Sequence, residues 1–200
     1  VAQSMRVGFV HGVMNTDNMS ILGLTLDYGP YGWVENYDPD WTPNTTDAQG
    51  RRYRFGTQMQ VAYWNLVRLA QAPSPLFAEV APLQAGLDGF RERYEAEERG
   101  HLVAKLGLGE FREGDAELMT QFQQLLQEGE MDMTLAFRAL AAIDVDVLDI
   151  ALLEEAFYSP TAREQVLPAL TDCLQRYAAC VWAAGPPPPQ RRDGMQAANP

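Results

Sequence analysis

The spacing of hydrophobic and polar positions changes near residue 58. Before it, short apolar groups alternate with stretches rich in Asn, Asp, Thr and Gly, whereas after it apolar residues recur every three to four positions. The later spacing is typical of amphipathic helices. The first helical segment contains Val61, Trp64 and Leu66, and Pro73-Ser74-Pro75 ends it. We expect Trp64 to lie in the core. The pattern predicts loops and short strands up to residue 57 and a helical body over 58–184.

The rest of the helical body divides at turn residues. We expect helices over residues 76–106 (one helix or two), 115–128, 134–140, 147–158 and 162–182. The four consecutive prolines at 186–189 predict an extended polyproline spacer, so that 185–200 is a Pro-rich linker with a truncated continuation. The fold class is therefore mainly α.

The first 57 residues show weaker local signals. Residues 1–9 resemble the end of a helix, as if the chain entered within an element. Residues 21–26 alternate in a way that predicts a small β-hairpin, ending at Asp27-Tyr28-Gly29. Residues 31–57 form a long segment with many aromatic side chains, which favours an ordered, functional loop over a disordered one.

Composition and charge exclude some classes of protein. A net charge of −12 argues against a nucleic-acid surface, because phosphate backbones bind to Lys/Arg patches. The longest apolar runs are too short to span a membrane. Cys173 and Cys180 lie seven positions apart in a predicted helix, too far apart to bridge, so we expect two free thiols.

The residues most suggestive of chemistry lie around the predicted hairpin. We expect it to bring Asn18 and Asp27 together at its open end, where an amide oxygen and a carboxylate are suitable ligands for Mg²⁺ held jointly with substrate phosphates. His11 precedes Asn18 by seven positions, the same spacing as in the protein-kinase pattern H-R-D-x-x-x-x-N. The position of the kinase catalytic Asp is occupied by Val13, which cannot accept a proton. We expect His11 itself to be structural.

These residues belong to a longer match. Residues 11–30 closely resemble the selenoprotein O family, also called YdiU, whose members are protein adenylyltransferases. The further matches in order are residues 37–39, Asn44, Asp47, Gly50, Tyr53, residues 64–66, 105–108, 132–134, Phe137, Arg138, Asn199 and Pro200. The resemblance covers essentially the whole chain.

The resemblance implies a fold and an activity. It implies a protein-kinase-like C-terminal lobe over 1–184, with the catalytic loop, metal hairpin and activation-type loop in 1–57 and the helical body in 58–184. It implies a Mg-dependent pseudokinase that transfers AMP from ATP to Ser, Thr or Tyr hydroxyls of proteins. Asp17 corresponds to the general base, Asn18 and Asp27 to the ligands of Mg²⁺ (or Mn²⁺), and Asp27 contacts ATP through the metal.

The resemblance also implies partners and a location. The partners are ATP, protein substrates with hydroxyl side chains and the N-terminal lobe of the same protein, without nucleic acid or membrane. We expect a cytoplasmic protein if the source is bacterial and a mitochondrial one if it is eukaryotic.

Some features depart from the family pattern. The chain contains no G-x-G-x-x-G motif and a single lysine, Lys105, so the ATP-binding elements of the N-terminal lobe are not identifiable. We therefore expect the isolated chain to be inactive. Pro43 stands where bacterial members often carry a redox-active Cys, which argues against thiol switching in this protein. Two alternatives stay open: a non-catalytic kinase-like fragment, or a true phosphotransferase, against which Val13 counts.

Overall fold

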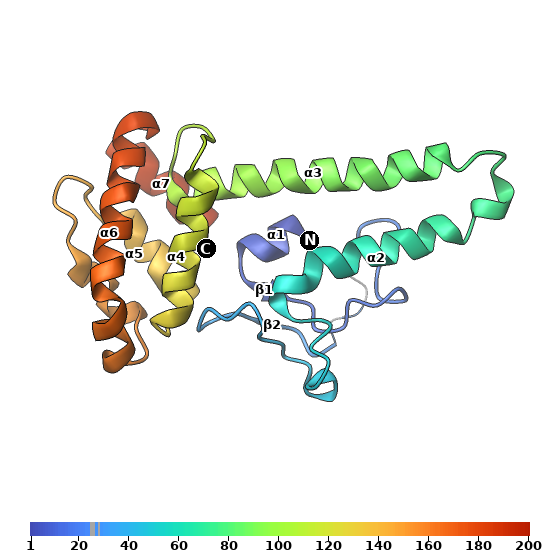
Figure 1. Ribbon diagram of the computed structural model, residues 1–200, viewed down its shortest axis with the longest axis horizontal. Helices are drawn as coiled ribbons and strands as arrows, with labels where there is room; N and C mark the ends of the chain where they lie inside the picture. The colour runs from blue at the N-terminus through green and yellow to red at the C-terminus, as the bar shows by residue number, and fades with distance from the viewer. Residues whose placement is uncertain (25–26, 28) are drawn as a thin grey trace. The chain divides into compact units, whose positions relative to one another are not determined.

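The computed structural model describes the whole chain except residues 25, 26 and 28, and it is mainly helical with one small antiparallel sheet (Figure 1). The chain divides into two compact units. The first consists of Val1–Met5, Phe9–Trp33 and Pro39–Glu97, and the second of Arg6–Gly8, Val34–Asp38 and Glu98–Pro200. The mainly α fold class is confirmed. Helix α2 and most of α3 belong to the first unit, together with the loops.

The sheet of the first unit joins segments far apart in the sequence. After the short helix α1 (Ala2–Arg6), strand β1 (Phe9–Val10) pairs with β2 (Gly32–Trp33), Phe9 opposite Trp33. The sequence predicted neither strand, since two residues are too few to show an alternating pattern. The predicted hairpin at 21–26 is described only in part. Residues 20–23 form a turn in which Gly23 N donates to Ser20 O, and residues 25 and 26 lie outside the described residues.

Two long helices carry most of the remaining first unit. Helix α2 (Gln58–Gln71) follows the 3₁₀ turn η2 (Phe55–Thr57), and α3 (Ala81–Leu106) follows η3 (Ser74–Leu76). The expected helix at 58 is therefore confirmed. The rings of Tyr63 on α2 and Phe90 on α3 stack with centroids 6.3 Å apart. One buried apolar cluster of this unit consists of Met14, Val61 and Ala62, with Val1, Met19, Tyr53 and Phe90 packed against it. Val10, Phe55 and Tyr94 are buried as well.

The second unit is a helical body with a larger apolar core. Helix α4 (Asp115–Glu128) packs on α6 (Pro160–Ala184), and α5 (Met133–Ala142) packs on α7 (Pro188–Ala198) and on the 3₁₀ helix η4 (Ile150–Ala156) (Figure 1). Phe122 of α4 and Phe137 of α5 meet edge to face, with centroids 5.3 Å apart, and both are buried. No described helix combines the length and the apolar character that crossing a membrane needs.

Two sequence expectations fail in the second unit. Residues 150–156 form a 3₁₀ helix where an α-helix over 147–158 was expected. Residues 188–198 form α7, so the predicted polyproline spacer is wrong there. The physical reason is that Pro188 and Pro189 occupy the first turn of the helix, where a missing N–H costs nothing. Beyond them, Arg191, Met195 and Ala198 are buried.

Candidate active site

The loop that contains the predicted catalytic residues begins directly after β1. Gly12 has a φ of +78°, and a Cβ on this residue would collide with the carbonyl oxygen of Pro30. Only glycine accepts both conditions, because left-handed backbone is strained for other residues and the approaching carbonyl leaves no room. Gly12 therefore fixes the direction in which the loop leaves the strand.

Two buried amide side chains of α2 hold this loop. Gln58 accepts a hydrogen bond from His11 N at 3.1 Å and donates to Phe9 O at 2.9 Å. Two turns further along the helix, the Asn65 side chain donates to Met14 O at 2.9 Å. Gln58 is 2% exposed and Asn65 is 5% exposed. Since buried polar groups without partners are costly, these bonds specify one conformation of the loop.

A third amide holds the loop from the segment after β2. Asn44 donates to Gly12 O at 3.0 Å, while its Oδ1 accepts from Thr46 N and Asp47 N and so caps the 3₁₀ helix η1 (Thr45–Asp47). Asn44 is itself buried. The loop 11–18 is thus fixed at three of its backbone groups by side chains from two other segments.

The predicted base and one predicted metal ligand lie side by side at the end of the loop. Asn18 N donates to Asn15 O at 3.2 Å, which closes a turn around Thr16 and Asp17. The Asn18 side-chain amide donates to Val13 O at 2.8 Å. This bond orients the side chain, and no hydrogen bond to its Oδ1 is present in the described part of the chain. The Asp17 carboxylate is exposed.

Asp27, the second predicted ligand, lies near the start of the same loop. His11 is 6% exposed, and burial lowers its pKa, while the negative charge of nearby Asp27 acts in the opposite direction. His11 Nδ1 accepts from Val13 N at 3.4 Å. The structure thus places Asp27 within electrostatic range of the loop. No hydrogen bond joins Asp17, Asn18 and Asp27 to one another among the described residues.

The chemistry of these side chains fits a metal held together with a substrate. In the described part of the chain, no group of three or more His, Cys, Asp or Glu side chains could hold a metal ion by itself. An amide oxygen and one or two carboxylates are the set that Mg²⁺ accepts when phosphate oxygens and water complete its coordination.

Sequence reasoning assigned no role to the three holding amides. Asn44 and Asn65 lie in the matching motifs, and Gln58 does not. A usable signal was nevertheless present, because Gln58 and Asn65 are seven positions apart and share a helix face with Val61 and Ala62. Polar residues on an apolar face are either misplaced or bonded to something specific.

Comparison with known proteins identifies the family. The family model described as protein adenylyltransferase SelO matches residues 1–185. Proteins named protein nucleotidyltransferase YdiU are similar over all 200 residues: 62% identical in Xanthomonas campestris pv. campestris (strain 8004), 62% in Xanthomonas axonopodis pv. citri (strain 306) and 60% in Xanthomonas oryzae pv. oryzae (strain PXO99A).

The chain spans 39% of the length of each of these relatives. The family model covers most of the chain, and the identity extends over all of it, through both the loops of the first unit and the helices of the second. The chain therefore belongs to the SelO family of protein adenylyltransferases.

Proposed function

We propose that this chain is the metal-binding and catalytic half of an enzyme that transfers AMP from ATP to Ser, Thr or Tyr hydroxyls of proteins, on a kinase-like C-terminal lobe. One observation carries the proposal. The Asn18 side-chain N–H group donates to Val13 O, no described residue donates to its Oδ1, and the preceding residue, Asp17, is exposed. Family membership supports the reaction class.

In the proposed reaction, the hydroxyl oxygen of the protein substrate attacks the α-phosphorus of ATP. The bond to the β-phosphate breaks, pyrophosphate leaves, and Asp17 takes the hydroxyl proton. Such general-base assistance contributes about 10²–10⁴-fold to a rate. Asn18 and Asp27 would hold Mg²⁺ (or Mn²⁺), which supplies charge neutralisation on the phosphate oxygens when bound.

The holding amides matter for this function because positioning supplies much of the catalysis in phosphoryl-group chemistry. Val13, at the position of a kinase base, contributes backbone groups: its carbonyl accepts from the Asn18 side chain and its N–H donates to His11 Nδ1. Asp17 is thus the carboxylate that this loop offers to a hydroxyl group. This distinguishes the proposed reaction from that of an ordinary protein kinase.

A chimera tests the proposal. The 200 matching residues of the Xanthomonas campestris relative are replaced by this chain, and a generic protein substrate is weighed by intact mass spectrometry after incubation with Mg²⁺ and ATP. We expect a mass increase of one AMP that is lost in Asp27→Ala and reduced about 10²–10⁴-fold in Asp17→Asn. Asp172→Asn, on the exposed face of α6, should leave the transfer unchanged. A mass increase of one phosphate would make the protein a kinase, and no increase would leave a non-catalytic module.

A further inference from the structure

Trp64 carries two arginine side chains on its ring. The guanidinium carbon of Arg52 lies 4.4 Å from the ring centroid, and that of Arg68 lies 4.6 Å from it. The sequence placed Trp64 in the core, but the residue is 38% exposed, which corrects that expectation. Arg52 and Arg68 are also exposed. The two guanidinium carbons are at most about 9 Å apart, which is comparable to the Debye length at physiological salt.

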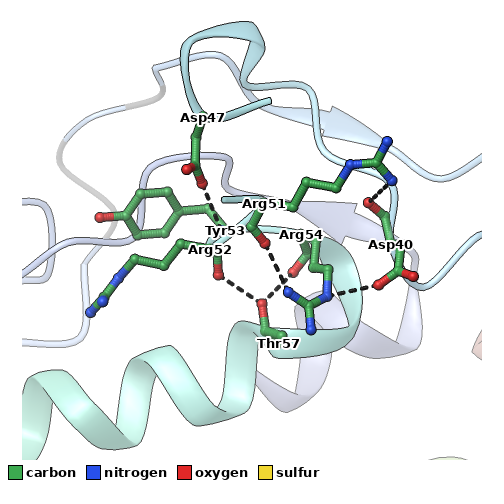
Figure 2. A network of polar contacts seen from close by, with 7 residues as sticks. All are labelled: Asp40, Asp47, Arg51, Arg52, Tyr53, Arg54 and Thr57. Atoms are coloured by element: carbon green, nitrogen blue, oxygen red, sulfur yellow. Dashed lines mark hydrogen bonds and ion pairs between the residues drawn. The ribbon is translucent and has the colours of Figure 1, made fainter. Parts of the chain in front are cut away.

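No carboxylate of the described residues forms an ion pair with either of these arginines. In the described part of the chain, the Arg52 side chain makes no ion pair, and Arg68 donates to the neutral amide oxygen of Gln71 at 2.8 Å. The neighbouring Arg54 behaves differently, since it pairs with Asp40 at 2.8 Å. Figure 2 shows the Arg52 side chain extending away from Asp40 and from that ion pair. Two positive charges are therefore left together on a protein whose net charge is −12.

Hydrogen bonds of the local backbone fix the position of the Arg52 main chain. Its carbonyl oxygen accepts from Thr57 Oγ1 at 2.7 Å, and the next residue, Tyr53, donates its N–H to Asp47 Oδ2 at 3.4 Å (Figure 2). Stacking on Trp64 then orients the guanidinium group. Because the side chain is ordered before a partner arrives, less conformational entropy is lost on binding.

We propose that Arg52 and Arg68, held on Trp64, form a docking site for an acidic segment of the protein substrate. A guanidinium group matches a carboxylate with two parallel hydrogen bonds, and Arg and Trp are enriched among residues that dominate binding energies. Carboxylates on alternate residues of an extended segment lie about 7 Å apart on one face. That spacing suits two guanidinium groups at most about 9 Å apart.

A carboxylate partner fits this site better than a nucleotide phosphate. Phosphate sites usually use backbone N–H groups at the start of a helix or in a nest. Arg68 lies in the last turn of α2, where the helix dipole is negative and favours the cation itself. The groups that would bind the anion here are therefore two exposed guanidinium side chains.

The proposal rests on the proposed function for the identity of the partner as a protein substrate, but binding is measured without turnover. A fluorescent peptide with Glu at alternate positions is titrated with the full chain, and its anisotropy is recorded. We expect binding that weakens at least about tenfold in the double variant Arg52→Gln/Arg68→Gln. The Arg52→Lys/Arg68→Lys variant keeps both charges but loses the planar guanidinium groups. Its affinity for the peptide should lie between those of the unchanged chain and of the double Gln variant.

The matched control is Arg91→Gln, which removes an exposed positive charge from α3 in the same unit and should leave the affinity unchanged. A peptide with Gln in place of Glu should not bind. Equal binding by the double variant, or no binding by the unchanged chain, would overturn the proposal. Tripolyphosphate binding without peptide binding would overturn it in favour of a nucleotide site. A chimera that binds the peptide but transfers no AMP would overturn only the proposed function.

Discussion

Different interactions stabilise the interior of each of the two units. In the first, fewer of the described apolar residues are buried than in the second, and the loop 11–18 takes its shape from hydrogen bonds to the side chains of Gln58, Asn65 and Asn44. In the second, long helices bury a continuous set of large apolar side chains around Phe122 and Phe137. The apolar core supplies most of the stability, whereas the amides select one loop conformation.

The difference matters because hydrogen bonds and apolar burial respond differently to mutation. Removing a core side chain leaves a cavity and lowers the free energy of unfolding of everything that depends on that core. Removing a buried amide leaves one or two backbone groups without partners and loosens the segment that they belong to. Two substitutions, one in each unit, separate these two outcomes, and a third tests a buried charge in the second unit.

The largest effect is expected at Phe137. Its side chain is fully buried and contacts the Phe122 ring. The Lys105 ammonium group also lies over it, 4.0 Å from the centroid of the Phe137 ring. Phe137→Ala should lower the free energy of unfolding by about 3–5 kcal/mol, measured by urea denaturation. Leu135→Ala on the same helix, where Leu135 is 42% exposed, should change it by less than about 0.5 kcal/mol. Similar losses in the two variants would show that this core does not stabilise the unit.

A smaller effect, opposite in sign, is expected at Lys105. Burial, together with the positive charge of Arg6, lowers the pKa of Lys105 to about 7. Its Nζ donates to Arg6 O at 2.9 Å, and the side chain is 8% exposed. Below pH 7 the ammonium group is charged in both the folded and the unfolded chain, so its desolvation destabilises the fold fully. Between about pH 7 and 10.5 the unfolded chain binds more protons, and stability therefore rises with pH.

Lys105→Met, which keeps the length and removes the charge, should therefore stabilise the chain by about 2–4 kcal/mol at pH 6. The gain should shrink as the pH rises toward 10, because the folded lysine is neutral above about pH 7 and keeping it neutral costs less as the unfolded chain approaches its own pKa of 10.5. Urea denaturation at pH 6 and at pH 9.5 measures both values. A gain of equal size at the two pH values would mean that packing, and not charge, accounts for it.

The sequence predicted the helices of both units better than the strands and the C-terminal segment. Helices such as α2 and α6 contain several turns of periodic apolar positions, and their ends carry local signals such as Pro73. The strands β1 and β2 have two residues each and pair across more than twenty positions, so no local pattern marks them. Helix α7 was missed because Pro188 and Pro189 suggest a spacer unless the buried residues that follow them are considered.

The residues of the candidate site were predicted only where their pattern is local in the sequence. The spacing of His11, Asn18 and Asp27 is local, and together with the family resemblance it named Asp17, Asn18 and Asp27, the residues that the proposed reaction uses. The amides that hold the loop act across 32 to 51 positions, and only the folded chain brings them there. Trp64 shows a related limit: its apolar ring predicted burial, but an aromatic face also attracts cations at the surface.

The smallest and most local effect is expected at Gln58. It tests whether hydrogen bonds to buried amides shape the loop 11–18 of the first unit. Gln58→Ala leaves His11 N and Phe9 O without their partner, while alanine preserves the helix. The expected cost is about 1–3 kcal/mol, which corresponds to about 5- to 150-fold faster hydrogen exchange at the His11 amide.

Gln60→Ala is the matched control, because Gln60 lies on the same helix and is exposed. The amide of Met131, bonded to Leu126 O in the second unit, serves as an internal reference and should keep its exchange rate in both variants. Faster exchange at Met131 and His11 alike would mean that Gln58 contributes to global stability. Unchanged exchange at His11 would mean that the loop keeps its shape without the amide. Faster exchange at His11 alone would separate the force that shapes the site from the force that stabilises the helical body.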